Sequence, residues 1–293
     1  MEISIRDATL VAAGFRTVGE GLDFLGLSSV ELAVDRDHQV SAIRPGENYR
    51  RMPIETDDDV EELRRHLEDT GVTVSAFLLS NDFGRADLDR EIAWVTRTVE
   101  AAGALGIPVV RIDTVMHGEH DRPVDERQRR FVEVVTRILN ATAEMEVCLG
   151  IENHGAQGND PAFHSGLFAE VGHPRFGLTL DTGNFYWSGM PLTRVYEVIA
   201  QFAPYARHTH VKNIGYPPSE RERERELGWR YADFVCPLEE GDIDLERVHS
   251  ILRDAGYDAA LCIEDESLGR FAPTERREVL RRDVAYLQRI LGA

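Results

Sequence analysis

Short apolar segments alternate with amphipathic segments along almost the whole chain of 293 residues. Residues 72–79 (VTVSAFLL) and 109–114 (VVRIDT) are apolar and rich in β-branched side chains, which predicts buried strands. Residues 57–70 and 88–105 carry apolar side chains at helical spacing, which predicts helices between such strands. Because strands buried on both faces and joined by helices form parallel sheets, the alternation predicts a parallel α/β protein.

A single (β/α)8 TIM barrel is the architecture that this alternation favours, because about eight strand–helix units fit one chain of this length. No GxGxxG or GxxxxGK loop follows a predicted strand, which argues against an open dinucleotide-binding sheet. No linker or composition break divides residues 1–293, so one TIM-barrel domain is expected. Residues 215–241, which contain proline and the run RERERE, predict an extended loop after strand seven, over the carboxyl face of the barrel.

Composition limits the partners of the protein. With 52 acidic against 33 basic residues, the net charge of -19 argues against nucleic-acid and membrane partners. The start of the chain has no apolar signal-peptide region and no segment has 18 consecutive apolar residues, so a cytoplasmic location is expected. The three cysteines are isolated, which argues against a disulfide framework or a thiolate zinc site. The RERERE run predicts a solvated helix or an oligomer contact, so a homo-oligomer is left open.

Four predicted strands in the second half of the chain end in an ionisable residue. These residues are Glu152 in CLGIENHG, Asp181 in GLTLDTGN, His210 in RHTHVKN and Glu264 in LCIEDE. The first three are spaced 29 residues apart, which suits one βαβ repeat, and 54 residues separate the last two, one repeat plus the long insertion. Since active sites of such barrels lie at the carboxyl ends of the strands, we expect the four side chains to converge on one divalent metal.

Three carboxylates and one imidazole form an oxygen-rich ligand set. Such a set favours Mn²⁺, with Mg²⁺ and Co²⁺ as alternatives, over a structural zinc ion, which prefers cysteine. A metal that holds both oxygens of a hydroxyketone polarises the carbonyl and acidifies the neighbouring C–H. Glu152 and Glu264, from the outer strands of the four, would flank the substrate, where one removes that proton and the other returns it.

The motifs GIENHG, LTLDTGN, HTHVKN, PLEEGDID and LCIEDE, in this order, resemble the sugar phosphate isomerase/epimerase family. This family belongs to the xylose isomerase-like TIM-barrel superfamily, with the ketose 3-epimerases and inosose dehydratases. The resemblance implies metal ligands at Glu152, Asp181, His210 and Glu264, and an acid/base pair at the two glutamates. The chain departs from the family pattern at Asn184, where ketose epimerases tend to have histidine, and at Asn213, where many relatives have aspartate.

Further candidates lie beside these four residues. His154 is expected either to orient the substrate or Glu152, or to be structural. Asn184 suits a substrate hydroxyl or a helix cap, and Lys212 suits an oxyanion or phosphate of the substrate, or a pairing with a carboxylate. His208 is expected to pack beneath the metal, and Glu31 to face the pocket from the end of an earlier strand.

Asp265 and Glu266, which follow Glu264, are predicted to be solvated.

The leading hypothesis is an enzyme, a metal-dependent isomerase or epimerase of a ketose or related polyol that works by proton abstraction. A lyase that removes a β-leaving group from a keto-sugar or inosose is the alternative at the same site. A repair nuclease would need a basic groove, which the net charge of -19 disfavours. The remaining hypothesis is a non-catalytic sugar-binding protein.

Overall fold

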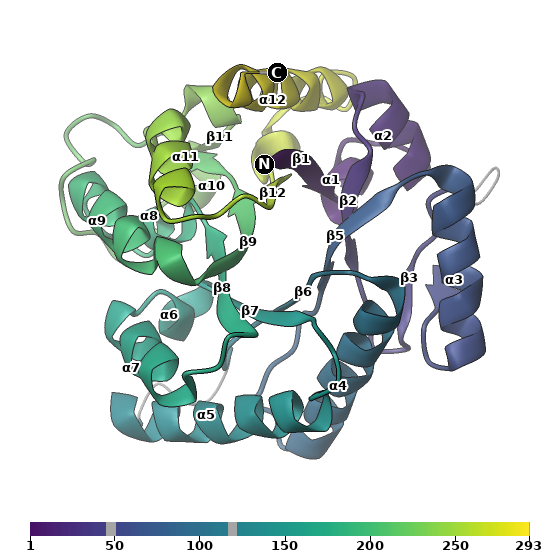
Figure 1. Cartoon of the computed structure of the whole chain (residues 1–293). Coiled ribbons are helices and arrows are strands. Elements are labelled where there is room, and N and C mark those ends of the chain that lie inside the picture. Colours follow the sequence, from purple (N-terminus) through teal and green to yellow (C-terminus); the bar gives the residue numbers. More distant parts are fainter. Residues whose placement is uncertain (45–50, 117–121, 293) are drawn as a thin grey trace.

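A computed structural model describes residues 1–44, 51–116 and 122–292 of the chain. Eight parallel strands close into a barrel, and the helices form a ring around it (Figure 1). The strands follow one another around the barrel as β1 (Glu2–Arg6), β2 (Ser29–Ala33), β5 (Thr73–Leu78), β6 (Val109–Ile112), β7 (Cys148–Glu152), β8 (Phe176–Asp181), β9 (Ala206–Val211) and β12 (Ala260–Ile263). The predicted (β/α)8 barrel is therefore confirmed.

The helices that surround the barrel vary from one turn to five. They are α1 (Asp7–Ala12), α2 (Val18–Leu25), α3 (Asp57–Thr70), α4 (Leu88–Leu105), α5 (Val124–Ala141), α6 (Gly155–Gly158), α7 (Pro161–Val171), α8 (Asn184–Trp187), α9 (Leu192–Phe202), α10 (Tyr231–Phe234), α11 (Leu245–Asp254) and α12 (Arg276–Leu291). Three short 3-10 helices, η1 (Ala203–Tyr205), η2 (Leu238–Glu240) and η3 (Ser267–Arg270), complete the set. None of the helices in the described ranges is long and apolar enough to cross a membrane.

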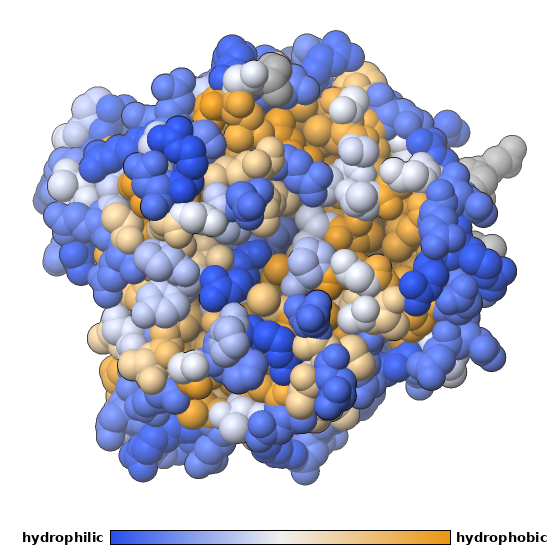
Figure 2. All heavy atoms as spheres, in the orientation of Figure 1, coloured by the Kyte–Doolittle hydropathy of each residue, from blue (hydrophilic) through white to orange (hydrophobic). Residues whose placement is uncertain are grey.

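Local sequence signals account for the limits of the helices. Thr56 and Asp59 form a capping box at the start of α3, each side chain accepting a hydrogen bond from the other residue's backbone N–H. Gly71 ends the same helix with φ of 65°, a left-handed conformation that glycine adopts without a steric penalty. Asp87 caps α4 in the same way as Thr56 caps α3. Polar side chains dominate the outer rim of the face in Figure 2, and apolar residues mixed with polar ones lie inside this rim.

The register of the strands brings the predicted ligands to one end of the barrel. Asp181 is the last residue of β8 and pairs with His210 of β9. Glu152 is the last residue of β7, which pairs with β8, and the backbone N–H of Glu264 donates to Val211 O of β9 at 3.0 Å. Because parallel strands end at the same face, neighbouring strands deliver their last side chains to one place.

The segment between β9 and α11 contains its own secondary structure. Strand β10 (Asn213–Ile214) pairs with β11 (Val235–Cys236) in an antiparallel ladder, and a second small ladder joins β3 (Gln39–Ser41) to β4 (Arg51–Pro53). The predicted helix in the RERERE run is wrong, because residues 221–223 form a turn and a bend and residues 224–226 have no regular secondary structure. The guanidinium of Arg225 donates to Tyr186 O and Met190 O instead, which ties this stretch to α8 and the residues after it.

Candidate metal centre

The four predicted ligands converge. Glu152, Asp181, His210 and Glu264 are all buried, and one donor atom from each lies within 4.8 Å of the others. Three adjacent barrel strands supply the first three residues, and the residue after β12 supplies the fourth. Side chains from distant parts of the chain thus form one compact set of three carboxylates and one imidazole.

His210 is oriented by Glu31 of β2. Its Nε2 lies 3.0 and 2.9 Å from the two carboxylate oxygens of Glu31, while Nδ1 faces Glu152 at 3.4 Å and Glu264 at 3.5 Å. Within the described residues, Nδ1 is buried and makes no hydrogen bond of good geometry. A carboxylate that accepts the other ring N–H is the common arrangement for a metal-binding histidine, because it fixes the tautomer. His210 therefore presents one free nitrogen to the carboxylates.

Asp181 is held by the backbone that follows β8. Its Oδ1 accepts the backbone N–H groups of Gly183 at 2.8 Å and Asn184 at 2.7 Å. Its buried Oδ2 has no hydrogen bond of good geometry in the described parts of the chain, although Lys212 Nζ lies 3.2 Å away. Asn153 joins the ends of β7 and β8, since its side chain accepts from Asp181 N at 2.7 Å and donates to Asp181 O at 3.0 Å. One carboxylate oxygen is thus fixed and the other turned toward the cluster.

Two arginines that are not among the predicted site residues flank the cluster. Arg6, the last residue of β1, pairs with Glu264 and lies 3.3 Å from Glu31. Arg111 of β6 pairs with Glu152 through Nε and Nη2, and with Asp113 through Nη1 at 2.8 Å. Arg111 interrupts the apolar run of VVRIDT, and a charge within such a run is a signal of a buried ion pair, whereas EISIR, which ends in Arg6, is too polar to give one.

The remaining predicted site residues lie around these groups. Asn184 Nδ2 donates to Glu152 Oε1 at 3.0 Å, and Lys212 Nζ lies 3.4 Å from Glu264. His154 has a side chain 40% exposed and bonds Asp113 rather than one of the four ligands, with Nδ1 2.8 Å from Oδ1. His208 is buried and lies 2.8 Å from Glu31, and its place beneath a metal stays a prediction. Lys212 is paired with carboxylates, and substrate contacts of His154, Asn184 and Lys212 stay predictions.

The prediction that Asp265 is solvated is wrong. Asp265 is 4% exposed, and its Oδ1 accepts the backbone N–H of Ser267 at 2.6 Å. The side chain of Glu266 is 41% exposed but takes part in the site, since it lies 3.4 Å from Lys212 Nζ and accepts a hydrogen bond from Tyr231 of α10. Burial and the charge of Glu266 raise the pKa of the Tyr231 hydroxyl, so this residue stays a hydrogen-bond donor.

The charges set the protonation of the cluster. Burial disfavours ionised Glu152, but Arg111 and His210 overcome this effect and hold its pKa well below the usual range. Burial likewise opposes protonation of His210, yet Glu31 and Glu152 raise its pKa to about 9. Burial and Glu152 raise the pKa of Asp181, although Lys212 lowers it. In the ion-free protein, a proton on His210 therefore offsets part of the negative charge.

The donor set fits a divalent metal. Six carboxylates gather here, from Glu31, Asp113, Glu152, Asp181, Glu264 and Glu266, against the three permanent cations Arg6, Arg111 and Lys212. Unpaired buried charges are costly, and a divalent cation would compensate two of the three excess negative charges once His210 loses its proton. The unpartnered Nδ1 of His210 supplies the atom that such an ion needs.

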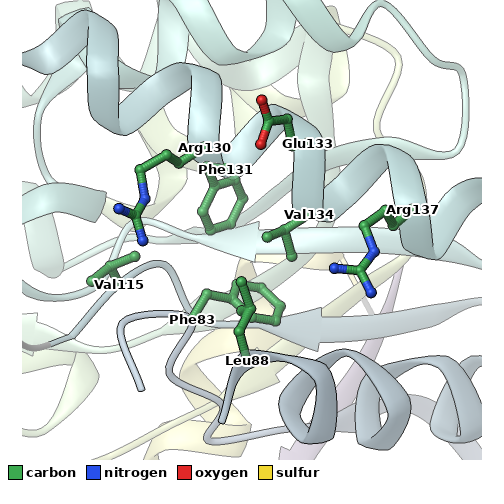
Figure 3. A pocket seen from close by; sticks show the side chains of 8 residues that line it. All are labelled: Phe83, Leu88, Val115, Arg130, Phe131, Glu133, Val134 and Arg137. Carbon is green, nitrogen blue, oxygen red and sulfur yellow. The ribbon is translucent and has the colours of Figure 1, made fainter. Parts of the chain in front are cut away.

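A hollow of about 290 Å³ lies apart from this cluster, beside α5 (Figure 3). Phe83, Phe131 and Val134 line it, with Arg130 and Arg137 on either side. Arg137 is also paired with Asp89 at 2.8 Å. The lining contains none of the four converging donors, so the chemistry of the barrel mouth does not extend into it.

Comparison with known proteins gives a consistent result. A family model described as "Xylose isomerase-like TIM barrel" matches residues 23–290. Solved structures that resemble the chain include the IOLI protein with a bound zinc atom (16% identity, TM-score 0.72, 99% of each chain covered). They also include the probable 3-DHS dehydratase AsbF from Bacillus anthracis (17%, 0.69, 98% of this chain and 99% of that one) and D-psicose 3-epimerase (16%, 0.67, 100% of each). No curated protein matches. Identities this low show a shared fold.

Proposed function

Since the chain belongs to the xylose isomerase-like TIM barrel family, we propose that it is a divalent-metal-dependent isomerase or epimerase of a ketose or related polyol. The observation that carries this proposal is the cluster of Glu152, Asp181, His210 and Glu264, whose donor atoms lie within 4.8 Å of one another. The neighbouring D-psicose 3-epimerase supports the reaction class, and the zinc in the IOLI structure supports a metal. Among divalent ions, the oxygen-rich donor set favours Mn²⁺.

The four residues would hold the ion through three carboxylates and His210 Nδ1. When bound, the ion would polarise the substrate carbonyl and acidify the neighbouring C–H. Glu152 is suited to accept that proton, because Arg111 keeps it ionised and Asn184 fixes its orientation through Oε1. Glu264, held by Arg6 and Lys212, is suited to return a proton from the other side.

An uncharged substrate suits this site better than a phosphorylated one. Arg6, Arg111 and Lys212 each contact at least two carboxylates, so none of these three cations is left over for a phosphate. Even with a divalent ion, the carboxylates named above exceed the permanent cations and the ion by one charge. Hydroxyl groups of a free sugar can donate to carboxylates, whereas a phosphate dianion would be repelled.

A lyase is the second candidate, and one observation favours it. β-Elimination needs an acid for the leaving oxygen, and Lys212 Nζ lies 3.4 Å from Glu264, the glutamate on which the second proton transfer is proposed. Although burial opposes it, Asp181 raises the pKa of Lys212, so the ammonium stays protonated until a substrate approaches. The structural neighbour AsbF is itself a probable dehydratase.

Solvent deuterium exchange tests the proposal. The Mn²⁺-loaded protein, incubated in D₂O with a panel of ketoses, keto-sugars and inososes, should place deuterium on the carbon next to the carbonyl of the converted sugar. Glu152→Gln and Glu264→Gln should abolish exchange, whereas Glu170→Gln, at an exposed position of α7, should not. Turnover without exchange would contradict proton abstraction, and an unsaturated product with release of the leaving group would establish the lyase.

A further inference from the structure

A second group of potential metal ligands adjoins the first. One donor atom each from Asp113, Glu152 and His154 lies within 4.8 Å of the others, and Glu152 belongs to both groups. Two carboxylates and an imidazole are ligands that divalent transition metals accept, and a carboxylate shared between groups is suited to bridge two ions. The donors of this second group could therefore hold an ion next to that of the first group.

The guanidinium of Arg111 is inserted among the donors of this second group. Nη1 lies 2.8 Å from Asp113 Oδ2, both Nε and Nη2 pair with Glu152, and Nη2 lies 3.5 Å from His154 Nδ1. Nη1 also donates to Leu79 O at 2.7 Å, which anchors the group to the end of β5. A buried, planar cation thus contacts every donor of the second group.

In the described ranges, no single cation contacts every donor of the first group, although each of its carboxylates is paired with one. Lys212 Nζ pairs with Asp181 and Glu264, but across the described ranges it pairs with neither Glu152 nor His210. His210 Nδ1 is left without a hydrogen bond of good geometry. The first group therefore keeps a ring nitrogen that is not hydrogen-bonded within the described residues, whereas one guanidinium contacts every donor of the second group.

We propose that Arg111 takes the place of a second divalent cation and so restricts this site to one metal ion. This inference rests on the proposed function for the first ion. Arginine cannot be deprotonated under protein conditions, so its charge excludes a second cation at every pH at which the protein is folded. Four of its N–H groups are engaged with Asp113, Glu152 and Leu79 O, so Arg111 holds Glu152 in place and does not coordinate substrate oxygens as a second ion would.

The test is the number of metal ions bound per chain. Each variant is dialysed against Mn²⁺, and bound metal is measured by elemental analysis, with electron paramagnetic resonance to detect magnetic coupling between paired ions. Wild type should bind one ion, and Arg111→Met should bind two with a coupled spectrum. Arg111→Lys, which keeps the positive charge, should bind one. In Arg111→Met/Asp113→Asn the second ion should be lost, because the second group then lacks a carboxylate.

Circular dichroism first establishes that each variant is folded, and Arg111→Gln replaces Arg111→Met if the latter is not. A folded Arg111→Met or Arg111→Gln variant that binds a single ion would overturn the inference, as would a wild type that binds two. The first site has its own control, since Asp181→Asn should remove the single ion of the wild type. A wild type that binds none, or an Asp181→Asn variant with unchanged metal content, would instead refute the proposed ligand set.

Discussion

Asn213→Asp is expected to destabilise the protein severely, although the two side chains have nearly the same shape. Asn213 is fully buried, and its Nδ2 donates to Leu238 O at 2.7 Å and to Ile243 O at 2.9 Å. Its Oδ1 accepts the backbone N–H of Ile243 at 3.0 Å. These bonds hold the segment after β9 against η2 and the approach to α11. An ionised aspartate has no donor and would face two carbonyl oxygens.

The size of the effect follows from the hydrogen bonds. A buried carboxylate beside two carbonyls will take up a proton, and holding that proton at pH 7 costs about 4 kcal/mol for a group with an ordinary pKa of about 3.9. The protonated acid donates to only one of the two carbonyls. Leaving the other buried carbonyl without a hydrogen bond costs roughly 1–3 kcal/mol. The free energy of unfolding should therefore fall by about 5 kcal/mol at pH 7. Because the folded-state pKa is raised, the deficit should shrink as the pH falls toward 4.

Urea-induced unfolding at several pH values measures this difference. The control is Asn140→Asp, at an exposed position near the end of α5, which should cost less than about 1 kcal/mol. A loss below about 1 kcal/mol for Asn213→Asp, or a deficit that does not depend on pH, would refute this account. It would mean that the aspartate found in many relatives at this position is compatible with the hydrogen bonds seen here.

Two further changes test the surroundings of the site and the stability of the barrel. Glu31→Gln should weaken Mn²⁺ binding roughly 10–100-fold, because a neutral amide then replaces the carboxylate that accepts from His208 and His210. Equal Mn²⁺ affinity of the variant and the wild type in competition dialysis would contradict this role. His164 donates to Gly158 O among aromatic rings, and burial lowers its pKa to about 4. In the unfolded chain the pKa of His164 is about 6.5, so the unfolded state takes up a proton before the folded state does. The free energy of unfolding should therefore decline by up to about 3 kcal/mol as the pH falls from above 6.5 toward 4. In unfolding experiments His164→Phe should show a shallower decline, and an unchanged pH profile would exclude this residue as the cause.

The barrel and the four converging side chains could be predicted from sequence for one physical reason. Parallel strands buried on both faces are largely apolar, and Glu152 and Asp181 are the charged residues that end the apolar runs of β7 and β8. All parallel strands end at one face, so Glu152, Asp181 and His210 needed no further information to be brought together. The barrel is confirmed by the closed order of its strands, whereas the metal-binding role of these residues stays a prediction.

The partners of these residues could not be predicted, because they depend on how the barrel closes. Arg6 reaches Glu264 only because β1 pairs with β12, which joins the two ends of the chain. Glu31 reaches His210 across the barrel interior from β2. The spacing along the sequence does not indicate that Arg6 pairs with Glu264, or Glu31 with His210, rather than with one of the many other charged residues. The burial of Asp265 could not be predicted for a related reason, because charged residues directly after a strand end are commonly exposed to solvent.

The departures from the family pattern fit this division between ligands and partners. Asn184, where ketose epimerases tend to have histidine, donates a neutral hydrogen bond to Glu152 and adds no charge to a cluster that Arg111 already neutralises in part. The motif that ends each strand can therefore be kept while the residues around it change the charge and orientation of the same ligands. Arg6, Glu31 and Arg111 lie on β1, β2 and β6, outside the motifs that carry the resemblance. Differences in reaction between members of such a family should accordingly be sought on the first four strands of the barrel, whose side chains set how the shared ligands behave.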